Sequence, residues 1–205
     1  MKVKAKTKKI ILILLICLSA VLIFSGCKTK ENPKIQVEME NGDIFIIELY
    51  PEYAPKTVAN FIKLVEEGFF DDTVFHRIIP NFMAQGGGFD INGNAKESEW
   101  IDGEFDVNGY KKNTLKHTKG VISMARMDTS EWGDPKIGYN SASGGFFIVL
   151  ETSPHLDGKY AAFGKVIEGM ENVNKFKKVE IQKDARGELS QPVTPVILKK
   201  MTVIK

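Results

Sequence analysis

The chain has 205 residues, with 28 Lys and Arg against 26 Asp and Glu and a formal net charge of +2. This length is typical of one domain and is sufficient to bury a core without metal or disulfide cross-links. Five lysines and no acidic residue lie in residues 1–26, so the rest of the chain has a net charge of −3. The charge therefore excludes the basic excess typical of nucleic-acid-binding proteins, and we expect no nucleic acid among the partners.

The N-terminal residues have the pattern of a secretory signal peptide. Five lysines within residues 2–9 precede an uncharged, apolar run over residues 10–24. At about 15 residues, this run is shorter than the roughly 20 that a spanning helix needs, so we expect cleavage. Ser25-Gly26-Cys27 resembles a bacterial lipobox, although Phe24 stands where Leu is usual. We therefore predict a lipoprotein signal peptide over residues 1–26 and a lipid on Cys27 that anchors the chain to the cell membrane at its extracytoplasmic face.

The remaining chain is predicted to consist of a short linker and one domain. Residues 27–33 hold the lipidated cysteine and a polar linker, and residues 34–205 form the folded domain. Cys17 lies in the apolar run, so the domain itself has no cysteine for a disulfide, which an extracytoplasmic location permits. Alternatively, the signal peptide stays uncleaved as a tilted anchor and leaves Cys27 unmodified, with the domain on the same side of the membrane.

The first elements of the domain are predicted to be a hairpin and a helix. Apolar and polar residues alternate on both sides of Asn41-Gly42, a dipeptide that strongly favours a tight turn between two strands. A helix is expected to begin at Pro55 and to end before Gly68, since proline early and glycine late are the usual helix signals. Its apolar face is formed by Val58, Phe61, Ile62 and Val65.

The sequence pattern over the rest of the domain predicts strands. Short apolar runs bounded by Gly, Pro and Asn indicate a β-sandwich or a barrel. These runs cover residues 74–79, 82–85, 121–125, 146–150, 160–166 and 196–204, with a weaker helical segment at 170–176. Two irregular, charged segments, 89–119 and 126–143, are predicted to be long surface loops around a site. In the second loop, Trp132 is expected to pack against the loop itself and not to contact a binding partner.

Four ordered motifs resemble those of the cyclophilins, the peptidyl-prolyl cis-trans isomerases. They are Val74-Phe75-His76-Arg77-Ile78-Ile79-Pro80-Asn81-Phe82-Met83-Ala84-Gln85-Gly86-Gly87-Gly88, Gly120-Val121-Ile122-Ser123-Met124-Ala125, Phe146-Phe147-Ile148, and the run over residues 156–166. The resemblance implies an all-β (mainly β) fold, a closed antiparallel eight-stranded β-barrel capped by two α-helices. It also implies peptidyl-prolyl cis-trans isomerase activity on proline-containing polypeptides, here exported clients.

The resemblance implies that Arg77, Gln85 and Phe82 are catalytic. Rotation about a prolyl bond has a barrier of roughly 18–20 kcal/mol because it breaks amide resonance, and no nucleophile or cofactor is needed to lower it. Arg77 would donate to the lone pair that the twisted amide nitrogen recovers, and Gln85 would bind the carbonyl as it rotates. An isolated strand arginine would instead be read as half of a surface ion pair.

The resemblance also implies a substrate-binding set, in which Arg126 contributes its backbone: Met83, Ala125, Arg126, Phe147, His155, Leu156 and Tyr160. Three positions depart from the common pattern, because many cyclophilins have Trp at His155, His at Tyr160 and Ser-Gln at Gly144-Gly145. Loss of an indole at His155 removes a donor and a stacking surface, so we expect weaker cyclosporin binding, measurable as a higher Kd than that of Trp-bearing members.

The histidines are not predicted to form a metal site or to act as a base. Strand alternation points His76 away from Arg77, so we expect a core histidine there. His76, His117 and His155 are too far apart in sequence for a ligand motif, so no metal and no cofactor are expected.

Competing hypotheses remain for the function of the groove. We expect a monomeric isomerase; the alternatives are a proline-segment binding module or chaperone with little catalysis, and a surface adhesin with long loops. An Arg77→Ala variant would separate the isomerase from both alternatives.

Overall fold

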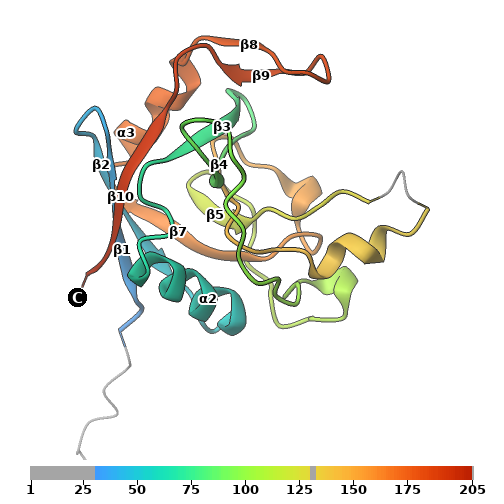
Figure 1. The fold of residues 1–205 in the computed structure, drawn as a ribbon. Coiled ribbons are helices and arrows are strands. Elements are labelled where there is room, and N and C mark those ends of the chain that lie inside the picture. The colour runs from blue at the N-terminus through green and yellow to red at the C-terminus, as the bar shows by residue number, and fades with distance from the viewer. Residues whose placement is uncertain (1–30, 130–132, 205) are drawn as a thin grey trace, which may run out of the picture. The chain divides into compact units, whose positions relative to one another are not determined.

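Eight strands close into an antiparallel barrel in the order β1-β10-β3-β4-β6-β5-β7-β2 in the computed structural model of the chain (Figure 1). The structure describes residues 31–129 and 133–204, so Cys27 and Trp132 lie outside the described residues. The barrel strands are β1 (Lys34–Met39), β2 (Ile44–Leu49), β3 (Thr73–Ile79), β4 (Met83–Asp90), β5 (Val121–Met124), β6 (Phe146–Val149), β7 (Ala162–Glu168) and β10 (Ile197–Ile204). The predicted eight-stranded barrel is confirmed.

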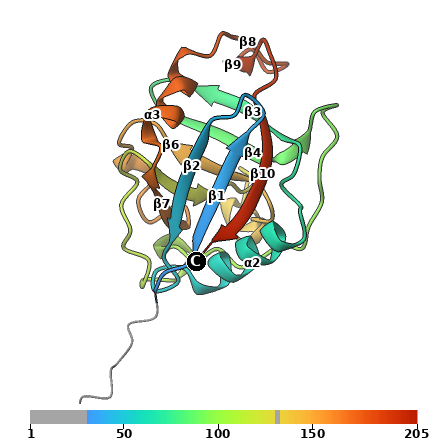
Figure 2. The same ribbon diagram turned by 90° about the vertical axis from the view of Figure 1, so that its left-hand side faces the viewer.

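Two helices close the ends of the barrel. Helix α2 (Pro55–Glu66) and helix α3 (Met170–Val173), which continues as a 3-10 turn over Asn174–Lys178, lie at opposite ends in Figure 2. Phe61 of α2 packs against three core phenylalanines, with 4.9 Å between its ring centroid and that of Phe70. Phe176 packs on Phe75 from the other end, at 4.7 Å. The predicted helix boundaries at Pro55 and before Gly68 are confirmed.

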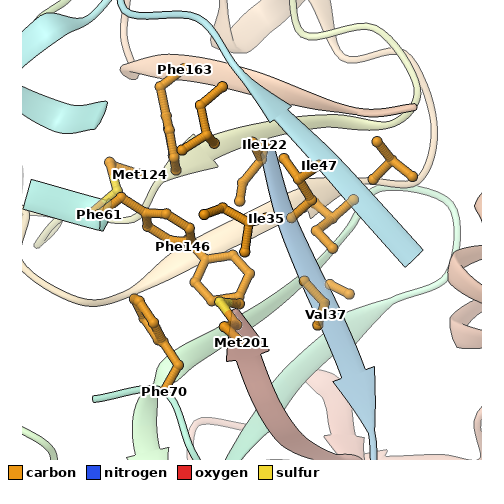
Figure 3. Packing of buried hydrophobic residues seen from close by; sticks show 14 of the residues in the cluster. Ile35, Val37, Ile47, Phe61, Phe70, Ile122, Met124, Phe146, Phe163 and Met201 are labelled. Carbon is orange, nitrogen blue, oxygen red and sulfur yellow. The ribbon is translucent and has the colours of Figure 1, made fainter. Parts of the chain in front are cut away.

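The strands with continuous apolar sequence are buried on both faces. In β6, Phe146 and Ile148 belong to the cluster inside the barrel, which Figure 3 shows. Phe147 and Val149 point the other way and belong to a second cluster with Met83. Alternate residues of a strand face opposite sides, so an uninterrupted apolar run requires cover on both. The second cluster forms the floor of a groove on the outside of the barrel.

Part of the predicted surface loop 89–119 is instead a structural support, which corrects that prediction. Glu104 is only 3% exposed, and its carboxylate accepts hydrogen bonds from the N–H groups of Lys56 and Thr57 and from the Thr57 hydroxyl, at 2.7–3.0 Å. The residue before α2, Ala54, offers no capping side chain. Glu104 therefore satisfies the free N–H groups at the start of α2, where negative charge is also favoured by the helix dipole.

A short hairpin that the sequence did not predict follows the second helix. It consists of β8 (Ile181–Lys183) and β9 (Leu189–Pro192), which pack beside β3 (Figure 1). Asp184 closes its turn by accepting hydrogen bonds from the N–H groups of Arg186 and Glu188, both at 2.9 Å. The hairpin is mostly exposed and carries no alternating apolar pattern, so it left no strand signal in the sequence.

Candidate active site

The outside of the barrel carries a groove of about 910 Å³ between β3, β4, the residues after β5, and the turn of the β8–β9 hairpin. Nine of the ten predicted catalytic and substrate-binding residues line it: Arg77, Phe82, Met83, Gln85, Ala125, Arg126, Phe147, Leu156 and Tyr160. The tenth, His155, is exposed and packs its ring on Phe82, with 5.3 Å between the centroids. The fold thus brings the predicted residues together, and their roles remain predictions.

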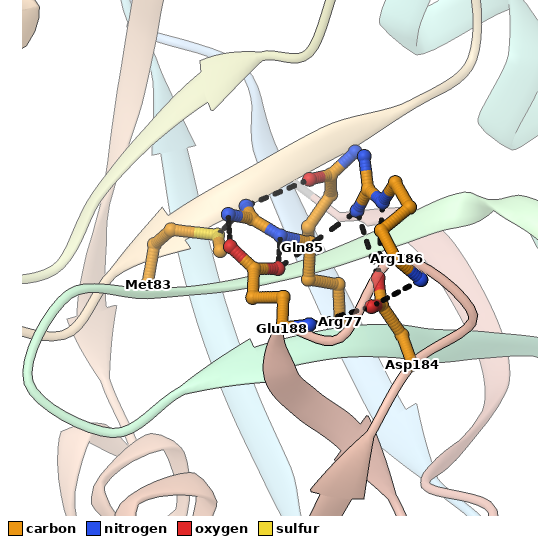
Figure 4. Close-up of polar contacts among 6 residues, drawn as sticks. All are labelled: Arg77, Met83, Gln85, Asp184, Arg186 and Glu188. Atoms are coloured by element: carbon orange, nitrogen blue, oxygen red, sulfur yellow. Dashed lines mark hydrogen bonds and ion pairs between the residues drawn. The ribbon is translucent and has the colours of Figure 1, made fainter.

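Arg77 extends over this groove from β3 and is held by a carboxylate. Its Nε and Nη2 donate to the two carboxylate oxygens of Glu188, at 2.6 and 2.8 Å (Figure 4). Its Nη1 faces Gln85 Oε1 at 3.5 Å and Met83 Sδ at 3.7 Å. Arg77 therefore forms an ion pair and also lines the groove, while its catalytic role stays a prediction. One edge of the guanidinium binds Glu188, and the other edge is directed to the apolar pocket.

Cross-strand pairing sets this arrangement. Arg77 lies opposite Gln85 in the antiparallel pair of β3 and β4. Directly paired residues share one face of a sheet, so the arginine and the glutamine side chains meet over the same pocket. Met83, two residues before Gln85, lies on that face and is buried in the second cluster. The pairing of β3 with β4 therefore produces the polar edge of the groove.

Aromatic side chains build the apolar floor. The ring of Phe147 meets that of Tyr160 edge to face at 5.8 Å and lies parallel to the ring of His117 at 6.1 Å. Leu156 and Phe82 complete the pocket, in which Met83, Phe147 and Leu156 are buried. Such a pocket suits a compact apolar ring.

The side chain of Arg126 makes contacts that the sequence did not predict. Its guanidinium lies over three aromatic rings, at 4.5 Å from Tyr160, 5.0 Å from Tyr139 and 5.5 Å from Phe105. It also donates to the carbonyl of Met127 at 3.1 Å. These cation–π contacts join the loop after β5 to the wall of the groove.

A Ser-His-Asp chain lies beneath the groove but cannot act as a nucleophilic triad. His117 Nδ1 is 3.1 Å from Asp157 Oδ1, and its Nε2 is 3.0 Å from Ser123 Oγ. Burial lowers the pKa of His117, although Asp157 opposes this shift. Ser123 is 0% exposed, so no substrate carbonyl can reach its hydroxyl. The hydrogen bonds with Asp157 and Ser123 instead hold His117 in place, and the parallel ring of His117 supports Phe147 from below.

His76 is not the core histidine that strand alternation predicted. A bulge shifts the register between Phe75 and Arg77, and His76 consequently lines the groove beside Arg77, half-buried against the ring of Phe89. Bulges interrupt alternation by adding one unpaired residue. Burial, and then the charge of Arg77, lower the pKa of His76 to about 4. The histidine is thus neutral in the folded protein near pH 7.

This neutral histidine makes the fold sensitive to acid. The unfolded chain takes up a proton near pH 6.5 and the folded chain only near pH 4, so stability is complete above 6.5 and is lost as the pH falls between these values. A His76→Phe variant should lose less stability between about pH 7.5 and pH 5, by roughly 2 kcal/mol. Urea unfolding of both proteins at both pH values measures this difference, and parallel losses would contradict it.

Gly144 and Gly145 differ in the space around them. A Cβ on Gly144 would lie 2.3 Å from the ring of Phe69, whereas one on Gly145 would meet only the Cβ of Ala125, at 3.5 Å. Gly144→Ala should therefore destabilise the fold by about 1–3 kcal/mol, and Gly145→Ala by less than about 0.5 kcal/mol. Chemical denaturation of the two variants compares them directly, and equal midpoints would refute the difference.

The residue that sequence reasoning missed is Glu188. It is the carboxylate partner of Arg77, and hydrogen bonds from Arg77 lower its pKa to about 2. A turn with aspartate and glycine in Asp184-Ala185-Arg186-Gly187 was the available signal for a hairpin at this position. Among the residues that the structure describes, no group of three or more His, Cys, Asp or Glu could hold a metal ion.

The closed antiparallel barrel and the apolar pocket edged by Arg77 and Gln85 agree with the resemblance of the four sequence motifs to the cyclophilins. Residues 34–203 match the family model described as "Cyclophilin type peptidyl-prolyl cis-trans isomerase/CLD". The chain belongs to this family.

Relatives in bacteria and fungi support this membership. The chain is 38% identical over 150 residues to peptidyl-prolyl cis-trans isomerase B of Bacillus subtilis, covering 73% of this chain and 94% of that protein. It is 36% identical over 160 residues to a peptidyl-prolyl cis-trans isomerase-like 2 of Cryptococcus neoformans, covering 78% of this chain and 25% of that protein. The chain thus spans about a quarter of the length of the longer fungal relatives that it matches.

Solved structures share the fold. A cyclophilin-type isomerase of Cryptosporidium parvum superimposes with a TM-score of 0.64 and 27% identity, covering 85% of this chain and 98% of that chain. A second structure of that protein was determined in the presence of the dipeptide Ala-Pro. A cyclophilin of Hirschia baltica has a TM-score of 0.63 and 26% identity, covering 85% of this chain and 74% of that chain.

Proposed function

We propose that this protein catalyses cis-trans isomerisation of prolyl peptide bonds in newly exported proteins at the outer face of the cytoplasmic membrane. The observation that carries the proposal is the position of Arg77, whose Nη1 edge faces Gln85, Met83 and an apolar pocket suited to a pyrrolidine ring. Uncatalysed isomerisation takes tens of seconds, which is slow enough to limit folding after export.

In the proposed mechanism, the protein stabilises the twisted amide more strongly than the planar one. Phe82, Met83, Phe147 and Leu156 hold the proline ring, while the preceding carbonyl rotates and accepts a hydrogen bond from Gln85. Arg77 donates to the amide nitrogen as it recovers its lone pair. A charged donor in a partly desolvated groove contributes most of this selectivity. About 6 kcal/mol of selective stabilisation corresponds to an acceleration on the order of 10⁴.

A protease-coupled assay on a short peptide that contains proline tests this function. The full chain in detergent should isomerise the peptide far faster than the uncatalysed rate. Peptide binding without acceleration by a well-folded protein would favour the proline-segment binding module or chaperone.

We also propose that a lipid on Cys27 holds the monomeric domain at the membrane, as the lysine-rich start, the apolar run and Ser25-Gly26-Cys27 support. Tethering raises the local concentration of the enzyme where exported chains emerge. Within the described residues, none of the helices is sufficiently long and apolar to cross a bilayer.

Labelling of bacterial cells with radioactive palmitate tests the anchor. Label should appear in the wild-type chain, persist in a Cys17→Ala control and disappear in Cys27→Ala. Label that persists in Cys27→Ala would overturn this assignment.

A further inference from the structure

The contact between the β8–β9 hairpin and Arg77 is directional. Glu188 binds the edge of the guanidinium formed by Nε and Nη2, as Figure 4 shows. This two-point geometry fixes the plane of the group as well as its position, because a carboxylate matches the fork of an arginine. The opposite edge, Nη1, is thereby directed toward Gln85 and Met83, and so toward the pocket.

Other contacts are too weak to hold Arg77 in this orientation. Its side chain is 24% exposed at the open groove, and Gln85 Oε1 and Met83 Sδ lie 3.5 and 3.7 Å from Nη1. Both distances are long for a strong hydrogen bond. An arginine side chain also has several rotatable bonds and a large rotamer entropy. Without Glu188, the guanidinium would therefore sample several positions above the pocket.

Glu188 is itself fixed by the turn that carries it. Its N–H donates to Asp184 Oδ1 at 2.9 Å, and the next residue, Leu189, pairs with Lys183 of β8. Arg186 pairs with Asp184 at 3.0 Å, and its Nη2 also lies 3.8 Å from Glu188 Oε2. Glu188 is half-buried, with 35% of its side chain exposed. The carboxylate is thus presented to Arg77 from a closed, hydrogen-bonded turn.

From this geometry we propose that Glu188 is a positioning residue for isomerisation, which holds Arg77 in the orientation that stabilises the twisted prolyl amide. This inference rests on the proposed function. Glu188 does not contact the substrate; its effect passes through Arg77 alone. The β8–β9 hairpin belongs to neither the barrel nor its two helical caps. On this proposal it is nevertheless part of the catalytic apparatus.

Steady-state kinetics of a Glu188→Ala variant of the full chain, with a short peptide containing Ala-Pro, test the proposal. We expect kcat to fall about tenfold with KM changed by less than about twofold, because misorientation of a donor weakens the transition state more than the ground state. Glu180→Ala is the matched control, since it removes one exposed carboxylate next to the same hairpin, and it should retain wild-type kcat. Wild-type kcat in Glu188→Ala would overturn the proposal.

A double-mutant cycle separates positioning from a general effect on the fold. When Arg77 is already alanine, Glu188→Ala should change kcat/KM by less than about twofold, since its only route of action is gone. A full tenfold loss in the Arg77→Ala background would overturn the proposal, because Glu188 would then act independently of the arginine.

An NMR measurement that does not depend on turnover tests the contact between Glu188 and Arg77. In ¹H–¹⁵N spectra of the full chain, the Nε–H signal of Arg77, identified by its loss in Arg77→Ala, should exchange slowly with water. Glu188→Ala should abolish this protection and Glu180→Ala should retain it. If the wild type shows protection but no turnover, the proposed function fails and the positioning contact stands. Equal protection in Glu188→Ala would refute the positioning role.

Discussion

Replacement of Arg77 by alanine is expected to lower kcat/KM for a prolyl peptide by about 10²–10³-fold, which is the usual cost of removing one preorganised donor to a transition state. The variant loses the Nη1 donor over the pocket, while Phe82, Met83 and Phe147 still line it. Peptide affinity should therefore change little. The protease-coupled assay measures turnover, and titration with the same peptide measures binding.

Two further variants serve as controls for this loss. Arg77→Lys retains the charge, but all its donors are on one nitrogen, which cannot present one edge to Glu188 and another to the pocket, so its activity should be intermediate. Lys183→Ala removes one exposed positive charge from the neighbouring hairpin and should behave like the wild type. Turnover of Arg77→Ala within about threefold of the wild type would show that another group stabilises the twisted amide.

The largest effect on stability is expected at Glu104. Glu104→Ala removes the acceptor for two N–H groups at the start of α2 and for the buried Thr57 hydroxyl. Loss of a helix cap together with unsatisfied buried donors should cost about 2–4 kcal/mol. Urea denaturation measures this loss as a lower midpoint. Activity in the absence of urea should persist, because Glu104 does not line the groove.

Matched variants distinguish capping from charge at this position. Glu104→Gln retains one acceptor oxygen and should lose less stability than Glu104→Ala. Glu99→Ala removes a carboxylate that is 90% exposed, and its midpoint should stay within about 0.5 kcal/mol of the wild type. An unchanged midpoint in Glu104→Ala would show that α2 does not depend on this cap.

Local sequence patterns predicted most of the barrel because each pattern has a direct physical cause. Asn41-Gly42 places a residue with φ of 82° at the turn between β1 and β2, which glycine adopts without strain. Pro55 and the apolar face of α2 predicted a helix that the structure confirms. The apolar runs predicted strands because both faces of β5 and β6 are buried.

Long-range contacts explain what the sequence could not predict. Glu104 caps a helix that begins about 50 residues earlier in the chain, and Glu188 reaches Arg77 across 111 residues. Contacts between residues so far apart in the sequence produce no signal in local periodicity. His76 was misplaced because a bulge in β3 interrupts strict alternation. The family motifs predicted the groove residues but gave no information about the hairpin that holds Arg77.

The most direct test of the central claim is two-dimensional exchange NMR on an Ala-Pro peptide with a catalytic amount of the full chain. This measurement reads the interconversion of cis and trans forms without a coupling protease. The account predicts strong exchange cross-peaks with the wild type and much weaker cross-peaks with Arg77→Ala at the same protein concentration. Equal cross-peaks with both proteins would contradict the role of Arg77, and their absence with the folded wild type would contradict the proposed isomerase function.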